Sequence, residues 1–417
     1  MAVTKDQLLQ RVEADKGKLI EFLQGFIRCP SPNPPGDTQV AVAYIRKFLE
    51  ERNLPHRLVA PNPIMANIVG SFACGGSGRH LVLNGHIDVF PVGDGAGWSH
   101  GGPWSGALAD GKIFGRGACD MKCGTTASIF TYAYMHAIRD QLRGKLTLTC
   151  VSDEETFGPY GARYLFEKHR DEVKGDTCLN GEPSSPYTVR FGEKGPMWLT
   201  FTVKTKGGHG AYNHVSKSAN AIAADLIGKL KKLEKLPVPE NNNLMSALDA
   251  AKKAMDKAYG PGGAKIVRTV TVNPGVIRGG MKVNMISAEC TFELDVRLPN
   301  GVTDKDIIKG IDAIVAKVPE VSYRVDNFSP PSYCPPDGEM IQYVKANAKA
   351  IGGFDPMPVV SLGGTDARLW RYHDTPGIVY GPSPKSMGQV DEHVTVKEFM
   401  HVVKTHVACA FDYLSRG

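Results

Sequence analysis

The sequence predicts an α/β fold, built on a mostly parallel sheet with helices on both faces and interrupted by a smaller α+β unit. Up to about residue 194, apolar strand-like runs alternate with helical stretches, the pattern of a parallel sheet whose two faces are covered. From about residue 195 the strand-like runs alternate apolar and polar positions. After about residue 329 the helix and strand alternation returns. We therefore expect an α/β domain that is split by an insertion.

The first part of the chain supplies the elements of this sheet in order. Apolar residues at helical spacing predict helix between Leu8 and Ile27, and the proline-rich run 29–37 must be a loop. A second amphipathic helix is expected at about 39–52. Helices are also expected at 123–142 and 161–173, and strands at 66–72, 80–89, 145–154 and 176–182.

The segment 195–329 has the order of a ferredoxin-like α+β unit. Helical patterns near 216–236 and 303–318 separate strand patterns in the order β-α-β-β-α-β, with strands at 196–206, 268–280, 284–299 and 321–328. We expect this segment to be a lid, inserted into a discontinuous main domain that is formed by residues 1–194 and 330–417.

Composition excludes several classes of protein. The chain has 417 residues, of which 42% are hydrophobic and 22% charged, as in ordinary globular proteins. Its net charge of +6 is mild, and its densest basic run, 229–235, reads as a solvated helix face, so we expect no nucleic-acid partner. No apolar run is long enough to span a membrane and no signal peptide is evident, so we expect a cytoplasmic protein without a membrane partner. The nine dispersed cysteines are expected to be reduced.

Five short segments place histidine or carboxylate side chains at the ends of predicted strands or in loops. They are NGHIDV with His86 and Asp88 on one strand face, GRGACDMK with Asp120, DEET with Glu154 and Glu155, NGEPS with Glu182, and QVDEHVTV with His393. Each has an ordinary structural explanation when taken singly. A strand histidine is commonly a structural hydrogen-bonding residue, a loop aspartate a turn residue, and the pair Asp391–Glu392 a solvated surface feature.

Their common position favours chemistry instead. Ligands of open α/β sheets gather at the carboxyl ends of the strands, where these groups would meet. Several carboxylates in one crevice repel one another unless cations neutralise them. Because side chains alternate along a strand, Glu154 and Glu155 are expected to point in different directions and to have different roles.

The ordered motifs G-H-x-D, G-R-G-x-x-D-M-K, D-E-E, G-E-P and a late E-H resemble the M20 family of metallopeptidases and deacylases. The resemblance implies two divalent metal ions per chain, usually zinc, with cobalt or manganese also suited to the nitrogen and oxygen ligands. It implies that Asp120 bridges the two ions. One ion would also bind His86 and Glu182, and the other Glu155 and His393.

The same resemblance assigns roles to two further acids. Glu154 would be the general base, taking a proton from the attacking water and delivering it to the leaving amine. Asp88 would hold the His86 ring by a hydrogen bond to the ring nitrogen that does not face the metal.

The predicted lid contributes three further candidates by resemblance. KGGHGAY places His209 in a turn, like the histidine that reaches the partner subunit's site in dimeric relatives, so we expect a homodimer formed through the lid. VNMIS resembles a lid motif whose asparagine contacts substrate, here Asn284, although Ser287 stands where relatives have proline. Arg297, in LDVRLP, is a third candidate, with an ordinary ion pair at a strand end as its alternative.

A late glycine-rich loop completes the candidate site. LGGTDARLW places Gly364, Thr365 and Arg368 where relatives bind a substrate carboxylate, for which an arginine fork is suited. GEKG has Lys194 where some desuccinylases carry arginine, which argues against a strictly diacid substrate.

The sequence thus predicts a co-catalytic metallohydrolase that cleaves the amide of an N-acyl amino acid with a free carboxylate. A carboxypeptidase or dipeptidase acting on small peptides is the near alternative. A catalytically silent conjugate-binding homologue is disfavoured by the intact Glu154 and ligand set. A metal-dependent phosphoesterase is disfavoured because no phosphate-binding loop is present.

Overall fold

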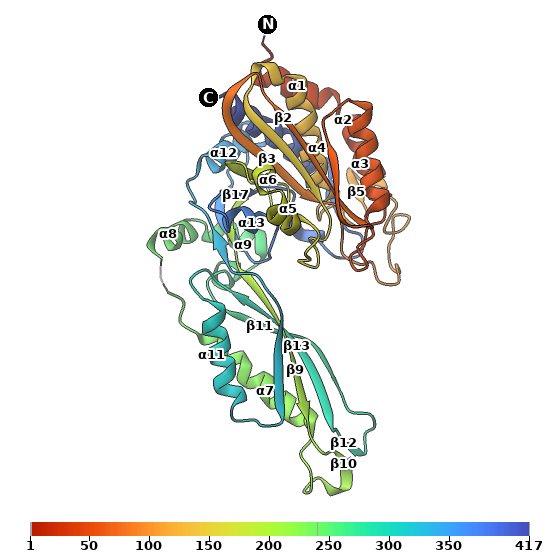
Figure 1. The fold of residues 1–417 in the computed structure, drawn as a ribbon, viewed down its shortest axis with the longest axis vertical. Coiled ribbons are helices and arrows are strands. Elements are labelled where there is room, and N and C mark those ends of the chain that lie inside the picture. Colours follow the sequence, from red (N-terminus) through yellow and green to blue (C-terminus); the bar gives the residue numbers. More distant parts are fainter. Residues whose placement is uncertain (1, 240, 417) are drawn as a thin grey trace.

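The computed structural model describes residues 2–239 and 241–416 as two units placed end to end (Figure 1). The upper unit contains a nine-stranded sheet flanked by helices, and the lower unit is built on a narrow four-stranded sheet. Both ends of the chain lie in the upper unit. The lower unit is therefore an excursion of the chain out of the upper one.

The large sheet is parallel at its centre. Its strand order is β1-β2-β6-β3-β7-β17-β8-β15, with β16 beside β8. The central strand β3 is parallel to β6 and β7, and β7 to β17, whereas β1, β2 and β15 are antiparallel to their neighbours. The predicted α/β class is confirmed. The strands are β1 (Arg57–Asn62), β2 (Met65–Ala73), β3 (Gly76–His86), β6 (Arg143–Val151), β7 (Thr177–Asn180), β8 (Thr188–Glu193), β15 (Ser332–Tyr333), β16 (Met357–Ser361) and β17 (Gly377–Val379).

Helices cover both faces of this sheet because its central strands are apolar on both sides. On β3, Leu81 and Leu83 pack into one core cluster, and Val82 between them packs into another. The larger cluster includes residues of α1 (Lys5–Ala14), α2 (Lys16–Ile27), α3 (Gln39–Glu51), α4 (Lys122–Ala137), α12 (Glu339–Gly352) and α14 (Val396–Ser415). The smaller cluster includes residues of α5 (Ala162–Lys168), α6 (Arg170–Val173) and α13 (Ala367–Arg371).

The lower unit has its own core. Its sheet has the antiparallel order β11-β13-β9-β14, and apolar side chains from α7 and α11 pack against it. The expected β-α-β-β-α-β order is present, and a two-stranded ladder of β10 and β12 forms the far tip (Figure 1). The elements are β9 (Gly195–Lys204), β10 (Gly208–His209), α7 (Ala219–Leu230), β11 (Thr271–Gly279), β12 (Met285–Ile286), β13 (Glu289–Leu298), α11 (Asp304–Val315) and β14 (Val321–Phe328).

One stretch of the expected insertion belongs to the other core. The helices α8 (Asn242–Ala250), α9 (Lys252–Tyr259) and α10 (Gly263–Ile266) follow α7, and Leu248 and Met255 from them are buried in the core cluster of the upper unit. The chain therefore passes between the units near residues 195, 236–242, 267–270 and 329, rather than only at the ends of 195–329. These three helices were not among the elements expected from the sequence.

A further small sheet, with three strands, belongs to the upper unit. It has the order β18-β5-β4, formed by β4 (Leu108–Ala109), β5 (Lys112–Phe114) and β18 (His393–Thr395). β18 runs directly into α14, so this sheet fixes His393 at the start of the last helix. It is antiparallel throughout.

Two expectations from composition can be compared with the structure. Over residues 2–239 and 241–416, the helices are too short or too polar to cross a membrane. All nine cysteines are free, as expected for reduced thiols, and eight of them are buried.

Candidate metal centre

The candidate metal-binding side chains converge because they follow neighbouring parallel strands. His86 is the last residue of β3, Glu154 and Glu155 follow β6, and Glu182 follows β7. In the sheet, β3 lies between β6 and β7, so the carboxyl ends of all three strands meet at one edge. Asp120 reaches the same point from the loop before α4.

His86 is the centre of the cluster and is almost fully buried. Its Nε2 atom lies 3.3 Å from Asp120 Oδ1 and 3.3 Å from Glu182 Oε1, with Glu154 Oε2 at 3.9 Å. Its Nδ1 atom lies 2.7 Å from the carbonyl oxygen of Asp88. When the N–H at Nδ1 donates a hydrogen bond to that carbonyl oxygen, Nε2 carries no proton, and its lone pair faces the acidic cluster.

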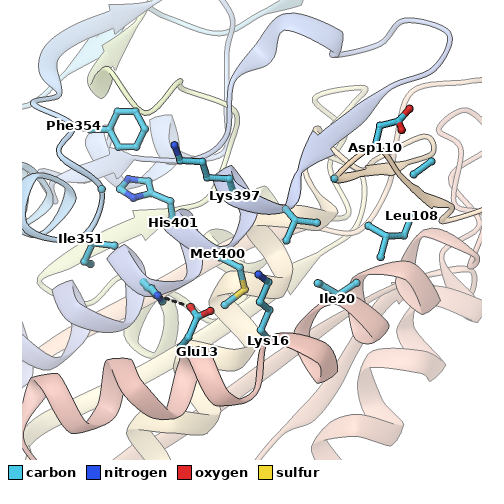
Figure 2. A pocket seen from close by; sticks show the side chains of 15 residues that line it. Glu13, Lys16, Ile20, Leu108, Asp110, Ile351, Phe354, Lys397, Met400 and His401 are labelled. Carbon is cyan, nitrogen blue, oxygen red and sulfur yellow. Dashed lines mark ion pairs between the residues drawn. The ribbon is translucent and has the colours of Figure 1, made fainter.

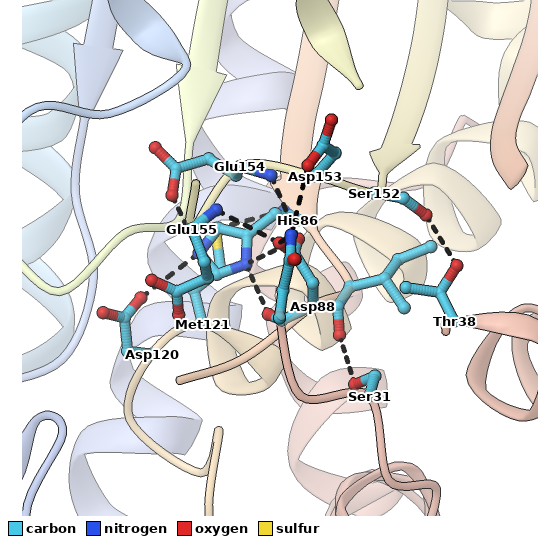
Figure 3. A network of polar contacts seen from close by, with 12 residues as sticks. Ser31, Thr38, His86, Asp88, Asp120, Met121, Ser152, Asp153, Glu154 and Glu155 are labelled. Carbon is cyan, nitrogen blue, oxygen red and sulfur yellow. Dashed lines mark hydrogen bonds and ion pairs between the residues drawn. The ribbon is translucent and has the colours of Figure 1, made fainter. Parts of the chain in front are cut away.

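Two overlapping groups of side chains have the geometry of a metal site. Figure 3 shows four of their members, His86, Asp120, Glu154 and Glu155. In each group, one ligand atom per residue lies within 4.8 Å of the others; the groups are His86, Asp120 and Glu155, and His86, Glu154 and Glu182. One carboxylate oxygen of Glu154 and one of Glu155 are buried with no hydrogen-bond partner among residues 2–239 and 241–416. Buried oxygens without donors are costly, and a divalent cation would satisfy them. The residues therefore fit a pair of metal ions.

The electrostatics of the cluster point the same way. Burial raises the pKa of Glu154 and Glu155 well above the usual value, and burial together with the Asp120 carboxylate raises the pKa of Glu182 to about 8. Burial alone would lower the pKa of His86, but Glu182 and Asp120 outweigh it and raise the value. Burial and the neighbouring carboxylates disfavour the ionised glutamates, and bound cations would stabilise them.

His393 lies outside both groups. It is half-buried on β18, where its ring packs 5.1 Å from that of Phe114, between ring centroids. Its Nδ1 atom lies 2.8 Å from the carbonyl oxygen of Asp391, which repeats the arrangement of His86 and Asp88 and leaves Nε2 free. The structure thus brings together four of the five expected ligands, and metal binding by His393 stays a prediction.

The prediction that Asp391–Glu392 is solvated surface is wrong for Glu392, which is fully buried. Its carboxylate accepts hydrogen bonds from the backbone N–H groups of Cys119 at 2.9 Å and Asp120 at 3.0 Å, and pairs with Arg116 at 2.5 Å. Glu392 therefore fixes the loop that carries Asp120. The only signal in the sequence was the arginine of GRGACD, a buried partner that spacing alone could not assign.

The expected hydrogen bond between Asp88 and the second nitrogen of the His86 ring is present, but the backbone carbonyl of Asp88 makes it and the carboxylate does not. Its carboxylate lies 3.6 Å from His86 Nδ1, too far for a hydrogen bond, and its carbonyl oxygen holds the ring instead. The carboxylate accepts hydrogen bonds from the backbone N–H groups of Glu154 and Glu155, at 3.2 and 3.1 Å, and from the Asn33 amide at 2.8 Å. Asp88 therefore orients the ring through its backbone and the two glutamates through its side chain.

The glutamate pair lies in a turn rather than at the end of a strand. β6 ends at Val151, and Asp153 adopts a left-handed φ of +68°, which is uncommon for a residue with a side chain. The Phe157 N–H donates to the Glu154 carbonyl at 2.7 Å and closes the turn. Strand alternation therefore does not apply, and both carboxylates reach one cluster from adjacent positions.

The late loop brings one of its three candidates to the cluster. Arg368 is buried, with Nη1 3.7 Å from Glu154 Oε1 and its guanidinium 4.6 Å from the centre of the Phe157 ring. Thr365, by contrast, donates its N–H and hydroxyl to the carboxylate of Glu193 at 3.0 and 2.9 Å. Gly364 lies against Phe157 with no room for a side chain. Binding of a substrate carboxylate by this loop stays a prediction.

Two of the three lid candidates, His209 and Asn284, lie far from the cluster within the single chain (Figure 1). His209 and Asn284 are exposed near the tip formed by β10 and β12, at the end of the lower unit opposite the large sheet (Figure 1). Arg297 lies on β13 and pairs with Asp295 at 2.8 Å, as its ordinary alternative predicted. Their roles in substrate binding stay predictions.

Glu155→Gln is expected to lower the metal content per chain. The substitution removes one negative charge and one buried oxygen from a group that has no competing hydrogen-bond donor at that oxygen. Metal analysis of the purified protein measures the change, with the exposed Glu167→Gln as control. Unchanged metal content would reverse the roles given to Glu154 and Glu155.

Comparison with known proteins agrees with this geometry. The sequence profile described as peptidase family M20/M25/M40 matches residues 82–412, which include the whole cluster. A succinyl-diaminopimelate desuccinylase of Cereibacter sphaeroides is 29% identical over 400 residues, covering 94% of this chain and 97% of the relative.

Solved structures show the same fold. An M20 family metallo-carboxypeptidase, Sso-CP2 of Sulfolobus solfataricus, superposes with a TM-score of 0.82 at 16% identity, over 95% of this chain and 99% of the other. The YXEP protein of Bacillus subtilis, described as a dinuclear metal binding peptidase, has a TM-score of 0.65 at 15% identity, over 96% and 99% of the chains.

These findings confirm the resemblance and the enzyme class that the motifs predicted. The profile spans most of the chain, and the desuccinylase matches it nearly end to end. The buried cluster that fits metal ions lies inside the matched region. The protein is a metal-dependent hydrolase, and its chain belongs to peptidase family M20/M25/M40.

Proposed function

We propose that this hydrolase cleaves the amide bond of N-acyl amino acids that carry a free carboxylate. The observation that carries the proposal is the buried cluster around His86. Its side chains have metal-binding geometry, and Glu154 in the same cluster lies beside Arg368. The desuccinylase similarity over 94% of the chain supports a deacylase. Arg368 supplies the fixed positive charge that a carboxylate substrate requires.

The chain's own groups divide the work of the reaction. Two divalent metal ions, when bound, supply Lewis-acid activation of a water and of the amide carbonyl. Asp120, His86 and Glu182 would hold one ion, and Asp120, Glu155 and His393 the other. Glu154 takes the proton of the attacking water and returns it to the amine as the amide bond breaks. Asp88 and Glu392 hold these groups in place through the backbone N–H bonds described above.

We propose zinc as the metal, with cobalt or manganese as alternatives. The ligands are imidazole nitrogen and carboxylate oxygen, which all three ions accept. Metal analysis after expression without added metal, followed by reconstitution with each ion, tests this choice. The same experiment on Glu155→Gln measures how much zinc, cobalt or manganese the variant retains per chain.

We also propose a homodimer that forms through the lower unit. His209 and Asn284 are exposed at its tip, where Met281, Val283 and Tyr212 are exposed as well. Large apolar groups gathered at a tip favour contact with a second chain. The nine free cysteines support our further proposal that the protein works in the reducing cytoplasm.

The second candidate function is a carboxypeptidase or dipeptidase. The fold similarity to the Sulfolobus metallo-carboxypeptidase, over 95% of this chain, favours it. The same metal centre would serve, since a peptide bond is also an amide. The choice between the two functions depends on which group the enzyme accepts on the acyl side of the amide bond that it cleaves.

A hydrolysis panel decides between these functions. N-acetyl and N-succinyl amino acids and free dipeptides are offered to the zinc, cobalt and manganese forms, and amine release is measured. The proposal expects kcat/KM to be highest for an N-acyl amino acid. Preference for dipeptides would favour the second function, and no turnover of any amide would refute both.

The interpretation of Lys194 as a sign of substrate type is not supported by its position. Its ammonium donates to the carbonyl oxygens of Ile266 at 3.0 Å and Thr269 at 2.6 Å, where the chain returns to the lower unit. Burial lowers its pKa to about 7. Lys194 thus ties β9 to the segment after α10.

Lys194→Met is expected to lower the melting temperature and to leave the ratio of N-succinyl to N-acetyl hydrolysis unchanged. The substitution removes the buried ammonium group and its hydrogen bonds to two part-buried carbonyl groups, and hydrogen bonds to a charged group are worth on the order of 1–3 kcal/mol. Thermal unfolding and the substrate panel measure the two effects. The exposed Lys232→Met is the control, and a changed substrate ratio in Lys194→Met would place Lys194 in the cleft instead.

A further inference from the structure

A cavity of about 700 Å³ opens on the upper unit (Figure 2). It is bounded by α1 and α2, the β4–β5 turn, the end of α12 and the first turns of α14. None of the residues that line it is a candidate metal ligand, base or substrate-binding residue. Its size lies within the range of about 300–1,000 Å³ that is typical of small-molecule sites. The proposed function leaves it unexplained.

The wall of the cavity is apolar. Ile20, Leu108, Phe354, Val396 and Met400 line it from four different elements (Figure 2). Leu108 is half-exposed, whereas Met400 is buried at the base. Such a wall accommodates a hydrocarbon or aromatic body, whose transfer from water supplies binding free energy.

The charges at the cavity favour an anion. Lys404 pairs with Glu13 at 2.6 Å, so these two neutralise each other. Lys16 and Lys397 also line the cavity, and neither has an ion-pair partner within 4.0 Å among the residues that the structure describes. Asp110 is the remaining acid of the lining. A carboxylate placed between the two lysines would therefore meet a net positive charge.

A buried histidine adds an unsatisfied polar atom to the wall. His401 is only 5% exposed, and its Nε2 atom lies 2.7 Å from the Tyr380 hydroxyl. Its Nδ1 atom is buried, and no residue in the described part of the chain forms a hydrogen bond with it. The Tyr380 hydroxyl lies 3.3 Å from the Pro186 carbonyl oxygen and closer to Nε2 of His401. In the tautomer in which this hydroxyl donates to Nε2, Nδ1 carries the ring proton and can donate it to an anionic ligand. The ring lies against Phe354, with 4.7 Å between ring centroids (Figure 2).

We propose that this cavity binds a small amphipathic carboxylate, with its apolar body against Met400 and Phe354 and its carboxylate near Lys16, Lys397 and His401. The apolar wall suits the hydrocarbon part of such a ligand. The two unpaired ammonium groups and the buried ring nitrogen without a partner suit its carboxylate. The site is separate from the metal centre, so the ligand is not the substrate in its reacting position.

Calorimetric titration of the metal-loaded protein with decanoate tests the proposal. We expect saturable binding, a loss of at least about tenfold in affinity for the double variant Lys16→Ala/Lys397→Ala, and much weaker binding of decyltrimethylammonium, because the cation is repelled where the carboxylate is attracted. The matched control is Lys305→Ala/Lys309→Ala, which removes two exposed lysines from α11 of the lower unit. Its affinity for decanoate should equal that of the unaltered protein.

A second variant tests the apolar end. Met400→Trp is expected to fill the base of the cavity and to abolish decanoate binding, while its melting temperature shows whether the fold is kept. Absence of decanoate binding to the unaltered protein would overturn the proposal. Equal affinity in Lys16→Ala/Lys397→Ala and in the unaltered protein would overturn it too, since binding would then occur elsewhere, including at the metal centre.

Discussion

Glu154→Gln is expected to retain both metal ions and to lose turnover by about 10²–10⁴-fold, the usual contribution of a general base. Glutamine keeps the size of the side chain but cannot take a proton from water. The side chain is buried, with one oxygen that has no hydrogen-bond partner and lies 3.7 Å from Arg368. The substitution therefore removes the proton acceptor while the residues around it stay in place. Steady-state kinetics and metal analysis of the same sample measure the two effects.

Comparison with Glu155→Gln distinguishes the general base from the metal ligand. Both residues follow β6, and Asp88 holds both backbones, so the two variants differ only in which carboxylate is removed. If Glu154 is the base and Glu155 a ligand, one variant loses turnover with metal retained and the other loses metal. Full activity of Glu154→Gln would contradict the assignment.

His209→Ala is expected to cripple turnover in a protein whose own metal centre is unchanged. Within one chain His209 lies at the tip of the lower unit, far from the large sheet (Figure 1), so any role in the reaction must be played in the partner's site. Mixing equal amounts of His209→Ala and Glu154→Gln chains should make about a quarter of the sites active. About half of the randomly formed dimers are then mixed, and in each mixed dimer one of the two sites has both its own glutamate and the histidine of the other chain. Activity before and after mixing, under conditions where subunits exchange, measures the rescue.

The neighbouring His214→Ala is the matched control for this experiment. His214 is exposed, and its ring lies 6.4 Å from that of Tyr212, between centroids. Its loss should leave turnover unchanged. A mixture of His209→Ala and Glu154→Gln chains that forms mixed dimers without recovering activity would rule out the cross-subunit role.

The sequence predicted the centre of the site because its residues obey a rule of sheet topology. His86, Glu154, Glu155 and Glu182 each follow a strand, and strands that alternate with helices pair in parallel, which places their carboxyl ends together. Motif order then distinguished the family. The same rule yields the α/β class and the helices on both faces.

Hydrogen bonds and ion pairs between residues far apart in the chain could not be predicted from the sequence. Glu392 appeared to be a surface acid, since nothing local shows that Arg116 and two backbone N–H groups near Asp120 surround it. Asp88 was assigned to the His86 ring because strand spacing puts both on one face, but β3 ends at His86, and the Asp88 carboxylate instead accepts hydrogen bonds from the backbone of Glu154 and Glu155. The partners of the Glu392 and Asp88 carboxylates lie far away in the chain, so no local pattern in the sequence indicates them.

The course of α8–α10 has a consequence for how the lower unit can be separated or exchanged. These helices leave the lower unit, bury Leu248 and Met255 in the core of the upper one, and then return. Excising residues 195–329 as a cassette would therefore open the core of the remaining part, which costs several kcal/mol for each large apolar side chain removed. A version of this enzyme reduced to its metal-binding half must keep 242–267 through a new connection. Recombination among homologues is accordingly expected to preserve this excursion together with the large sheet, and to vary the strands beyond it.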